Sequence, residues 1–321
     1  MIIPIFVPHE GCPNDCAFCN QRTISGKNSA PSIIEARNVI EAHLESADKK
    51  AKQIAFFGGS FTGIDVKKQN EYLSLALEYI KKGVVESIRL STRPDYIDRE
   101  TVKRLLSYGV RNIELGAQSM DDTVLLRSNR GHSSADVEKA AQIITESSAV
   151  LGLQMMTGLP FDNDEKCLYT ARRFYELGAK ETRIYPTVVL GGTLLAKMYE
   201  DGEYKPQTVE DAVSISAKLY RYFKEKDIEI LRIGLPDGDD LKKNYIAGAY
   251  HPSLGEMVIS RDVRNRLKKE IKASTDVYVN PRFISKFNGN KRCNIDYFKE
   301  KGITLNVILD ESIEEYEIRR S

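Results

Sequence analysis

The chain has 321 residues, which is enough for one large domain with its own hydrophobic core and a smaller appendage. Its 47 Lys and Arg nearly balance its 46 Asp and Glu, so the overall charge gives no argument for binding nucleic acid or a membrane. Because the N-terminus lacks the basic start of a signal peptide and no run approaches the roughly 18 apolar residues of a membrane helix, we expect a cytoplasmic protein with no membrane partner.

Short apolar segments alternate with longer amphipathic segments through most of the chain. The apolar segments predict strands at residues 2–7, 53–57, 87–91, 112–115, 152–156 and 183–189. The amphipathic segments predict helices at residues 32–49, 67–81, 99–108, 135–147, 165–177 and 209–226. Repeated strand–helix units build a parallel sheet with right-handed crossovers. We therefore predict an α/β fold over residues 1–233, a partial (β/α)6 barrel of the TIM type in which functional residues follow the strands.

A turn-rich segment at residues 234–240 separates this domain from a predicted C-terminal extension. The extension, residues 234–321, has the pattern of a small α+β unit. Helices are expected at residues 254–272 and 294–301, and strands at residues 276–279, 303–309 and 314–318. We expect this extension to bind the substrate.

Basic residues concentrate in the extension. On its first helix, Arg261, Arg264, Lys268 and Lys272 fall at steps of three and four residues and share one face. Between Arg261 and Arg292, ten Lys and Arg stand against three Asp and Glu, a local charge of about +7. Such a surface fits the phosphate backbone of a nucleic acid, although an ordinary solvated helix face has the same pattern.

Three of the five cysteines, Cys12, Cys16 and Cys19, follow the first predicted strand at a Cys-x3-Cys-x2-Cys spacing. A cytoplasmic chain keeps its thiols reduced, which favours a metal site over disulfides. Three thiolates suit a 4Fe–4S cluster in which one iron stays open to a non-protein ligand. A zinc site completed by His9, or three unconnected buried cysteines, would fit the same spacing.

A glycine pair follows the second predicted strand directly, in the order Gly58, Gly59 and Ser60. Paired glycines let a ligand approach the backbone closely, and exposed N–H groups can meet a carboxylate. An ordinary turn uses the same residues, so the pair alone is weak evidence. Its place after a strand of a predicted barrel, next to the cysteine loop, favours a binding role.

These motifs resemble one family when taken together. Gly-Cys-Pro-Asn-Asp-Cys-Ala-Phe-Cys-Asn-Gln at residues 11–21, Gly-Gly-Ser-Phe-Thr-Gly at residues 58–63 and Ser-Thr-Arg-Pro-Asp at residues 91–95 resemble the radical S-adenosylmethionine (SAM) superfamily, in the branch that contains the catalytic subunit of Elongator. The resemblance implies a partial barrel, a 4Fe–4S cluster held by the three cysteines, and SAM as the second cofactor. Phe18 would shield the cluster from water.

The resemblance also implies which residues contact SAM. In the superfamily the loop equivalent to Gly58, Gly59 and Ser60 holds the methionine part of SAM, and we expect Ser91 and Arg93, after the third strand, beside it.

Related oxygen-independent coproporphyrinogen oxidases suggest further contacts. A Gln and an Arg at the spacing of Gln118 and Arg130 contact SAM in those enzymes, where an amide can bind ribose hydroxyls and a guanidinium can pair with the carboxylate; local structural roles are the alternative. Gln154 stands where those oxidases carry an Asp that contacts SAM, which argues against tetrapyrrole decarboxylation here. Substrate-side candidates are Tyr185, which closes the sixth strand, and His251, as an acid or base or as a structural histidine.

The activity implied is reductive cleavage of SAM to methionine and a 5′-deoxyadenosyl radical, which abstracts hydrogen from a substrate. The low-potential cluster implies reduced ferredoxin or flavodoxin as electron donor. We predict an RNA substrate, in particular tRNA bound through the basic extension; a small-molecule or tetrapyrrole substrate is the enzymatic alternative, and a zinc-stabilised, non-catalytic RNA-binding protein is the alternative of another class. Because the chain starts eleven residues before Cys12 and ends without an acetyltransferase domain, we do not expect acetyl-CoA-dependent carboxymethylation of a tRNA uridine.

Overall fold

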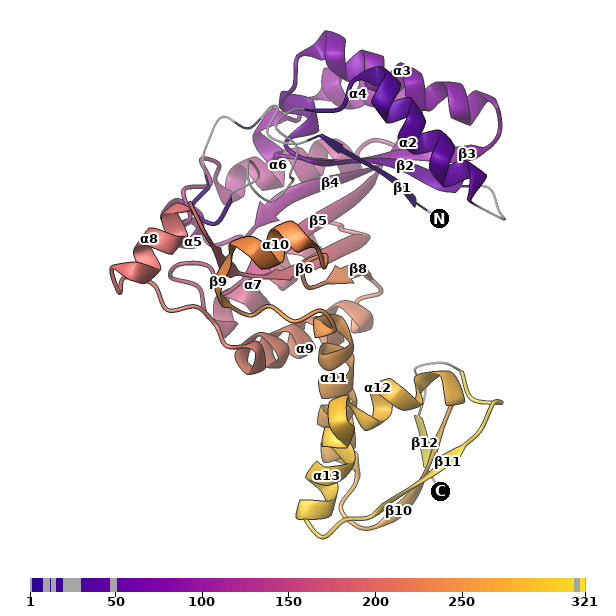
Figure 1. Cartoon of the computed structure of the whole chain (residues 1–321), viewed down its shortest axis with the longest axis vertical. Coiled ribbons are helices and arrows are strands. Elements are labelled where there is room, and N and C mark those ends of the chain that lie inside the picture. Colours follow the sequence, from indigo (N-terminus) through magenta and orange to yellow (C-terminus); the bar gives the residue numbers. More distant parts are fainter. Residues whose placement is uncertain are drawn as a thin grey trace.

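Parallel strands that follow one another along the chain form the centre of the molecule. A computed structural model describes residues 2–7, 12, 16–19, 30–46, 51–314 and 318–320, the side chains of Asp240 and Arg320 excepted. Within these residues, seven strands form one sheet in the order β1-β2-β3-β4-β5-β6-β8, and every neighbouring pair is parallel. The predicted α/β half-barrel is therefore confirmed (Figure 1). The strands are Ile2–Val7 (β1), Ala51–Gly58 (β2), Val85–Thr92 (β3), Val110–Gln118 (β4), Val150–Thr157 (β5), Glu181–Pro186 (β6) and Glu229–Ile233 (β8).

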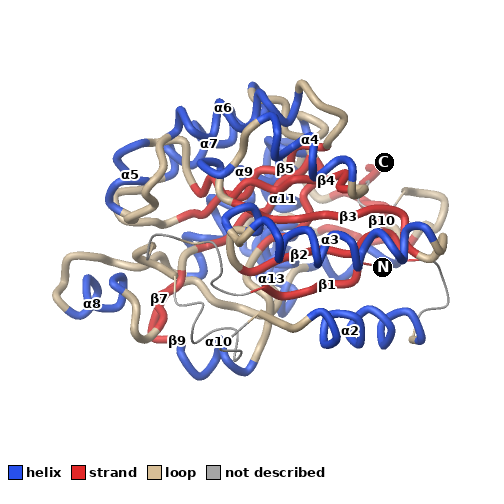
Figure 2. The backbone as a smooth tube through the Cα atoms, turned by 90° about the horizontal axis from the view of Figure 1, so that it is seen from above, coloured by secondary structure: helices blue, strands red, loops and turns tan. Residues whose placement is uncertain are grey.

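Helices cover the outer face of the sheet, as the amphipathic segments predict. Figure 2 shows α4, α6, α7 and α9 gathered on one side of the strands. Each main helix begins after a side chain that accepts hydrogen bonds from the free N–H groups of the first turn, such as Asp98 before α4 and Ser133 before α6. The main helices are Ile33–Glu45 (α2), Val66–Lys81 (α3), Arg99–Ser107 (α4), Ser134–Thr145 (α6), Asp164–Glu176 (α7) and Val209–Glu225 (α9).

The structure differs from the prediction at the sixth strand and after it. The expected strand at 183–189 is two strands, because β7 leaves the main sheet after β6 and pairs antiparallel with β9. The apolar pattern does not predict β8, since Glu229 and Arg232 interrupt it. It also misses short helices, of which α10 occupies part of the expected linker at 234–240. These elements are Asp122–Arg127 (α5), Val188–Leu190 (β7), Leu194–Glu200 (α8), Asp239–Asn244 (α10) and Tyr245–Gly248 (β9).

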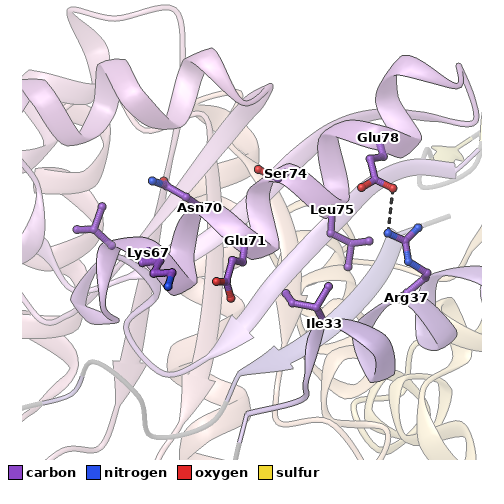
Figure 3. A pocket seen from close by; sticks show the side chains of 9 residues that line it. Ile33, Arg37, Lys67, Asn70, Glu71, Ser74, Leu75 and Glu78 are labelled. Atoms are coloured by element: carbon purple, nitrogen blue, oxygen red, sulfur yellow. Dashed lines mark hydrogen bonds and ion pairs between the residues drawn. The ribbon is translucent and has the colours of Figure 1, made fainter.

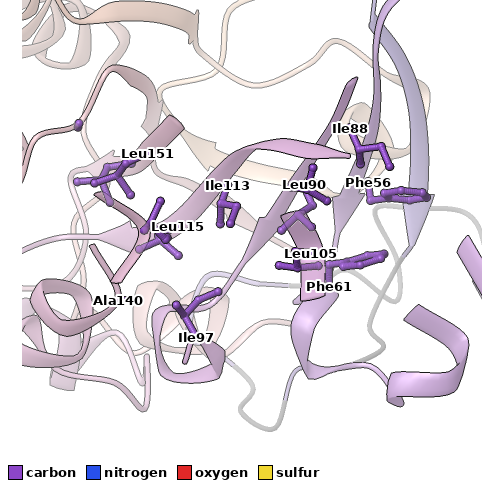
Figure 4. Packing of buried hydrophobic residues seen from close by; sticks show 14 of the residues in the cluster. Phe56, Phe61, Ile88, Leu90, Ile97, Leu105, Ile113, Leu115, Ala140 and Leu151 are labelled. Carbon is purple, nitrogen blue, oxygen red and sulfur yellow. The ribbon is translucent and has the colours of Figure 1, made fainter. Parts of the chain in front are cut away.

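The two faces of the main sheet differ in polarity. On the outer face, Leu90, Ile113 and Leu151 belong to the main hydrophobic core, which the covering helices complete (Figure 4). Successive side chains of a strand point to opposite faces, so Arg89 and Glu114 point to the concave side. The helices thus stabilise the sheet from outside, and the concave side is left for polar groups.

The C-terminal residues form a second layered unit, attached through α11. Val213 of α9 and Val258 of α11 share a hydrophobic cluster, and Arg221 Nε donates to Asp262 Oδ1 at 2.8 Å. In the described part of this unit, a sheet in the order β11-β10-β12 packs with helices around a separate core (Figure 1). The elements are Leu254–Glu270 (α11), Thr275–Val279 (β10), Ile284–Asn288 (α12), Cys293–Glu300 (α13), Leu305–Leu309 (β11) and Ile318–Arg320 (β12).

In the described residues, a short C-terminal strand and several 3-10 helices accompany the main elements. Residues 315–317 of the strand expected at 314–318 lie outside the described residues, and β12 begins just beyond them. Of the helices that the structure describes, none combines the length and the apolar character needed to cross a membrane. Short 3-10 helices lie at Phe61–Gly63 (η1), Pro94–Tyr96 (η2), Pro281–Phe283 (η3) and Asn290–Arg292 (η4).

Candidate functional site

The cysteine loop packs against the ends of two helices. Ala17 donates its backbone N–H to Ser128 O at 2.9 Å, after α5, and Ala17 O accepts the N–H of Leu195 at 2.7 Å, at the start of α8. Phe18 packs on the hydrophobic cluster that contains Val189 and Leu195. Because the loop itself follows β1 and α5 follows β4, the loop lies at the edge where the parallel strands end, as expected for a barrel site.

Arg130 joins this loop to β4. Its Nη1 donates to Cys16 Sγ at 3.1 Å and its Nη2 donates to Gly116 O at 2.6 Å. The side chains of Cys16 and Arg130 are both buried. Arg130 therefore ties the cysteine loop to the end of β4.

Cys12 lies beside the glycine loop that follows β2. The backbone N–H of Ser60 hydrogen-bonds the Cys12 thiol, and Cys16, Arg130 and Arg93 are close enough to act on it through their charges. Partial burial raises the pKa of Cys12, while the Ser60 N–H and the two arginines act in the opposite direction. The structure therefore brings together residues from the loops after β1, β2, β3 and β4.

The Gly58 backbone cannot carry a side chain without strain. Its φ is +116°, and an added Cβ would lie 2.9 Å from Val7 O. Gly59 donates its N–H to the same oxygen at 2.8 Å, so the loop is tied to the end of β1. Ser60 Oγ accepts the backbone N–H of Arg93 at 3.2 Å. The glycine pair thus allows strand ends to pack closely and brings the loop to the cysteines.

Buried polar atoms without a hydrogen-bond partner gather at this edge. Among the described residues they include Arg93 Nη1, Gln118 Oε1, Arg130 Nε and His132 Nδ1, on side chains that are each at least nine-tenths buried. Leaving such an atom unsatisfied costs roughly 1–3 kcal/mol, so the group indicates a polar ligand. N–H donors beside acceptors fit the carboxylate and ammonium of an amino acid such as the methionyl end of SAM.

Gln118 and His132 are held in unusual states. Gln118 has a φ of +69°, and its Nε2 and Arg130 Nη2 lie 2.9 and 3.3 Å from the point where a Cβ on Gly116 would sit. Burial lowers the pKa of His132 to about 4, and Arg130 and Arg93 act in the same direction. His132 is therefore neutral near pH 7. Sequence reasoning does not single it out, although it lies only two residues after Arg130.

A charged network fills the concave side of the sheet. Arg89 Nη1 donates to Glu114 Oε1 at 2.9 Å and to Glu181 Oε2 at 2.7 Å, and Arg183 Nε donates to Glu114 Oε2 at 2.6 Å. Pairing of this kind is what buried charges require. Gln154 Nε2 donates to Glu114 Oε2 at 3.0 Å, which connects the network to a predicted SAM contact. Apolar runs do not indicate these residues. The pattern that would predict them is a charged residue at every second position of a strand, as in Glu181 and Arg183.

The remaining predicted residues have separate environments. Gln154 Nε2 also donates to Ser91 Oγ at 3.3 Å, so these two predicted contacts are adjacent. Tyr185 hydrogen-bonds Arg183, and burial raises its pKa. His251 Nδ1 accepts a backbone N–H from two residues later, at 3.1 Å, and in the described chain none of its hydrogen bonds reaches the cysteine loop.

The three candidate metal ligands, Cys12, Cys16 and Cys19, are proposed from the chemistry and spacing of their thiols and not from a preformed metal site. Within the described residues, no three His, Cys, Asp or Glu side chains lie close enough together to hold a metal ion. Cys12 is exposed, Cys16 is buried and Cys19 is half-buried. His9, the alternative zinc ligand, lies outside the described residues. The fit of a cluster rests on three thiols in one short loop, one of them beside Arg130.

A surface groove with a volume of about 620 Å³ lies elsewhere, between α2 and α3. Ile33 and Leu75 line it, and Arg37 pairs with Glu78 at 3.0 Å at one end (Figure 3). The groove lies on the outer helices, whereas the cysteine loop lies at the strand ends. It does not belong to the candidate site.

Comparison with known families identifies the class of protein. A family model described as the radical SAM superfamily matches residues 6–174, more than half of the chain. A second model, described as a radical SAM C-terminal domain, matches residues 179–268.

Individual relatives agree with these matches. The tRNA uridine(34) acetyltransferase of Methanocaldococcus jannaschii is 24% identical over 255 residues, which cover 67% of this chain and 47% of that protein. Elongator complex protein 3 of Bos taurus is 27% identical over 206 residues, which cover 60% of this chain and 37% of that protein. The chain thus spans about half or less of these relatives' length.

A solved structure shows the same fold. The archaeal Methanocaldococcus infernus Elp3 with an N-terminal deletion superposes with a TM-score of 0.65 at 22% identity, covering 84% of this chain and 63% of that chain. The chain therefore belongs to the radical SAM superfamily, is similar to Elongator-like relatives, and is an enzyme whose cofactors are a 4Fe–4S cluster and SAM.

Proposed function

We propose that Cys12, Cys16 and Cys19 hold the cluster and that SAM binds beside them at the edge of the sheet. The observation that carries this proposal is the contact of Arg130 with Cys16, next to buried polar atoms that have no protein partner. When bound, the two cofactors supply reductive cleavage of SAM and a radical that abstracts hydrogen from the substrate. Family membership favours this site over the zinc alternative.

The unpartnered atoms give each side chain a binding role. Arg93 Nη1 and Arg130 Nε donate to the SAM carboxylate, because they are the N–H groups left free by the bonds to Asp95 and Cys16. Gln118 Oε1 and His132 Nδ1 accept from the ammonium or from a ribose hydroxyl.

The loops around the proposed SAM site would hold SAM next to the cysteines and exclude water. Gly58 and Gly59 bring the backbone of the second loop against the cysteines, and the Ser60 N–H already points to Cys12. Phe18 packs on the hydrophobic cluster at the start of α8, and in this position it would shield the iron–sulfur cluster from water. Water excluded from this space cannot quench a reactive substrate radical.

The concave side of the half-barrel presents the substrate-side groups. Ser91 and Gln154 are adjacent and Gln154 also contacts Glu114 of the charged network, so both side chains would be available to contact SAM. Tyr185, fixed by Arg183, faces the same side of the sheet and contacts the substrate. His251, which lies away from the cysteine loop, would act as an acid or base on a part of the substrate that extends toward it.

The substrate that we propose is RNA, in particular tRNA. Its support is the similarity to the archaeal relative, a tRNA uridine(34) acetyltransferase, together with the basic C-terminal residues. In this account residues 1–233 form the catalytic half-barrel and residues 234–321 bind the substrate. The second hydrophobic core, which begins at Val263, supports a separate C-terminal unit, while β9 pairs with β7 and so extends the first unit beyond residue 233. Reduced ferredoxin or flavodoxin supplies the electron.

Isotope transfer tests the substrate. The reconstituted enzyme is incubated anaerobically with SAM, a reductant and tRNA transcripts deuterated in the ribose or base. We expect deuterium in 5′-deoxyadenosine, because hydrogen moves from the substrate to the cleaved cofactor. Unlabelled 5′-deoxyadenosine with every transcript would contradict an RNA substrate and favour the small-molecule alternative.

A further inference from the structure

Cations from two separate elements surround one tyrosine in the C-terminal unit. Among the described residues, Arg264 Cζ, Lys268 Nζ and Lys301 Nζ lie 5.2, 5.2 and 5.3 Å from the centroid of the Tyr297 ring. Arg264 and Lys268 are one turn apart on α11, Tyr297 belongs to α13, and Lys301 directly follows α13. The ring packs on the core of this unit. We call these four residues the Tyr297 cluster.

The cations of the Tyr297 cluster form no ion pair among the described residues. In the part of the chain that the structure describes, no ion pair includes Arg264, Lys268 or Lys301, whereas Arg261 on the same helix pairs with Glu210 at 2.5 Å. Burial and the nearby Arg261 lower the pKa of Arg264, while Cys293, Glu210 and Tyr297 act in the opposite direction. The attraction of a cation to an aromatic ring is weak, so the ring offsets part of the repulsion among the three cations and a bound anion would offset more.

The predicted basic face of α11 is therefore narrower than its helical spacing indicates. Arg261 pairs with Glu210, and Lys272 lies beyond the end of α11, where its Nζ donates to Lys268 O at 3.0 Å. Arg264 and Lys268 are the cations of that face that reach the Tyr297 ring, and Lys301, which the helical spacing does not include, joins them.

We propose that the Tyr297 cluster binds the phosphodiester backbone of the RNA substrate, an inference that rests on the RNA substrate of the proposed function. Arg264 offers a planar fork that matches phosphate oxygens, and the two lysines add point charges. Because the ring already positions the three cations, less side-chain freedom is lost when the phosphate binds.

The location of the cluster favours a polymer over a small anion. The 17 residues of α11 span about 25 Å, and the helix leads from the half-barrel to the C-terminal unit (Figure 1). The cysteine loop packs against α5 and α8, which lie in the half-barrel at a distance from α13 (Figure 1). A ligand that contacts both places must be extended, as a folded RNA is.

Two double variants with the same change of charge test this site. Lys268→Gln with Lys301→Gln removes two cations of the Tyr297 cluster. Lys82→Gln with Lys226→Gln is the matched control, because these lysines lie 4.9 and 4.7 Å from the ring centroids of Tyr79 and Tyr175 in the half-barrel. Binding of a fluorescently labelled, unmodified tRNA transcript to the reconstituted full chain is measured by anisotropy over a series of KCl concentrations.

We expect the cluster variant to bind about tenfold more weakly and the slope of log affinity against log salt to fall by about 2, while the control stays close to the wild type.

Tyr297→Leu keeps both the net charge and an apolar side chain in the core, and should weaken binding severalfold with little change in melting temperature. Equal affinities and slopes for the two double variants would overturn the Tyr297 cluster as the backbone site and leave the RNA substrate standing. No binding of the transcript by the wild type would remove the RNA substrate, and with it this inference.

Discussion

At the scale of single residues, Arg130 determines the site. It contacts Cys16, which is 114 positions away in sequence, and holds Gly116 O with its second amino group. Only a planar guanidinium can make both contacts and keep Nε for a ligand; a lysine at this position cannot. The same side chain thus joins the cysteine loop to β4 and keeps an unpartnered Nε for the cofactor in the proposed function.

Gly116→Ala tests the space between Gln118 and Arg130. The added Cβ would displace Gln118 Nε2 and Arg130 Nη2, so we expect SAM affinity to fall by about tenfold or more while the cluster still loads. Anaerobic calorimetry of SAM binding measures the effect. Gly238→Ala, where a Cβ meets nothing within 4 Å, is the control. Equal affinities in the two variants would show that these side chains do not bind SAM.

His132 predicts a loss of stability in mild acid. Its pKa is lowered to about 4 in the folded chain, by burial and by Arg130 and Arg93 against a smaller opposing effect of Asp95. The unfolded chain takes up the proton at its ordinary pKa, so stability falls as the pH drops from about 6.5 toward 4. Between pH 7 and pH 5, urea unfolding of the cofactor-free wild type should lose roughly 2 kcal/mol more than His132→Gln. The same pH dependence in both chains would mean that His132 titrates normally.

At the scale of elements, the strands of the main sheet have apolar side chains on the outer face and charged side chains on the concave face. Leu90, Ile113 and Leu151 hold the outer helices, and the alternate positions, such as Arg89 and Glu114, build a charge-paired interior. A network that is fully paired keeps the concave side rigid below the site.

Glu114→Gln tests this interior. Removing the charge leaves the buried Arg89 and Arg183 without their shared carboxylate, so we expect the free energy of unfolding to fall by roughly 3–5 kcal/mol. Urea unfolding measures it. Glu146→Gln, which breaks an exposed pair with Arg99, should leave stability nearly unchanged. A similar small effect in both variants would mean that the network is solvated.

Periodicity predicts the elements whose signals are local. The six expected strands and the main helices are present, because long apolar runs and capping residues such as Ser133 act within a few positions. The edge strand β8, with its charged Glu229 and Arg232, is stabilised by its neighbour β6 and has no clear local pattern. Short helices such as α8 depend on contacts with distant segments, here with Ala17.

The candidate site is predictable in part for the same reason. Cysteine spacing and the glycine pair are local and indicate the cofactors. The contact of Arg130 with Cys16 and the burial of His132 depend on how distant loops meet, which no local pattern contains. The charged interior is visible only when residues from β3, β4 and β6 are placed side by side.

At the scale of the whole molecule, a half-barrel and a smaller C-terminal unit are joined through α9 and α11 (Figure 1). Val213 and Val258 pack between the two helices, and the ion pair of Arg221 with Asp262 fixes their relative position. In the proposed function, this arrangement would let one extended substrate contact both the cofactor site and the Tyr297 cluster.

The most direct test of the account is anaerobic reconstitution of the chain with iron and sulfide, followed by reduction in the presence of SAM. We predict about four irons per chain and formation of 5′-deoxyadenosine, both lost in a folded Cys16→Ala variant. A wild-type chain that takes up a single zinc instead, or that binds iron and forms no 5′-deoxyadenosine, would contradict it.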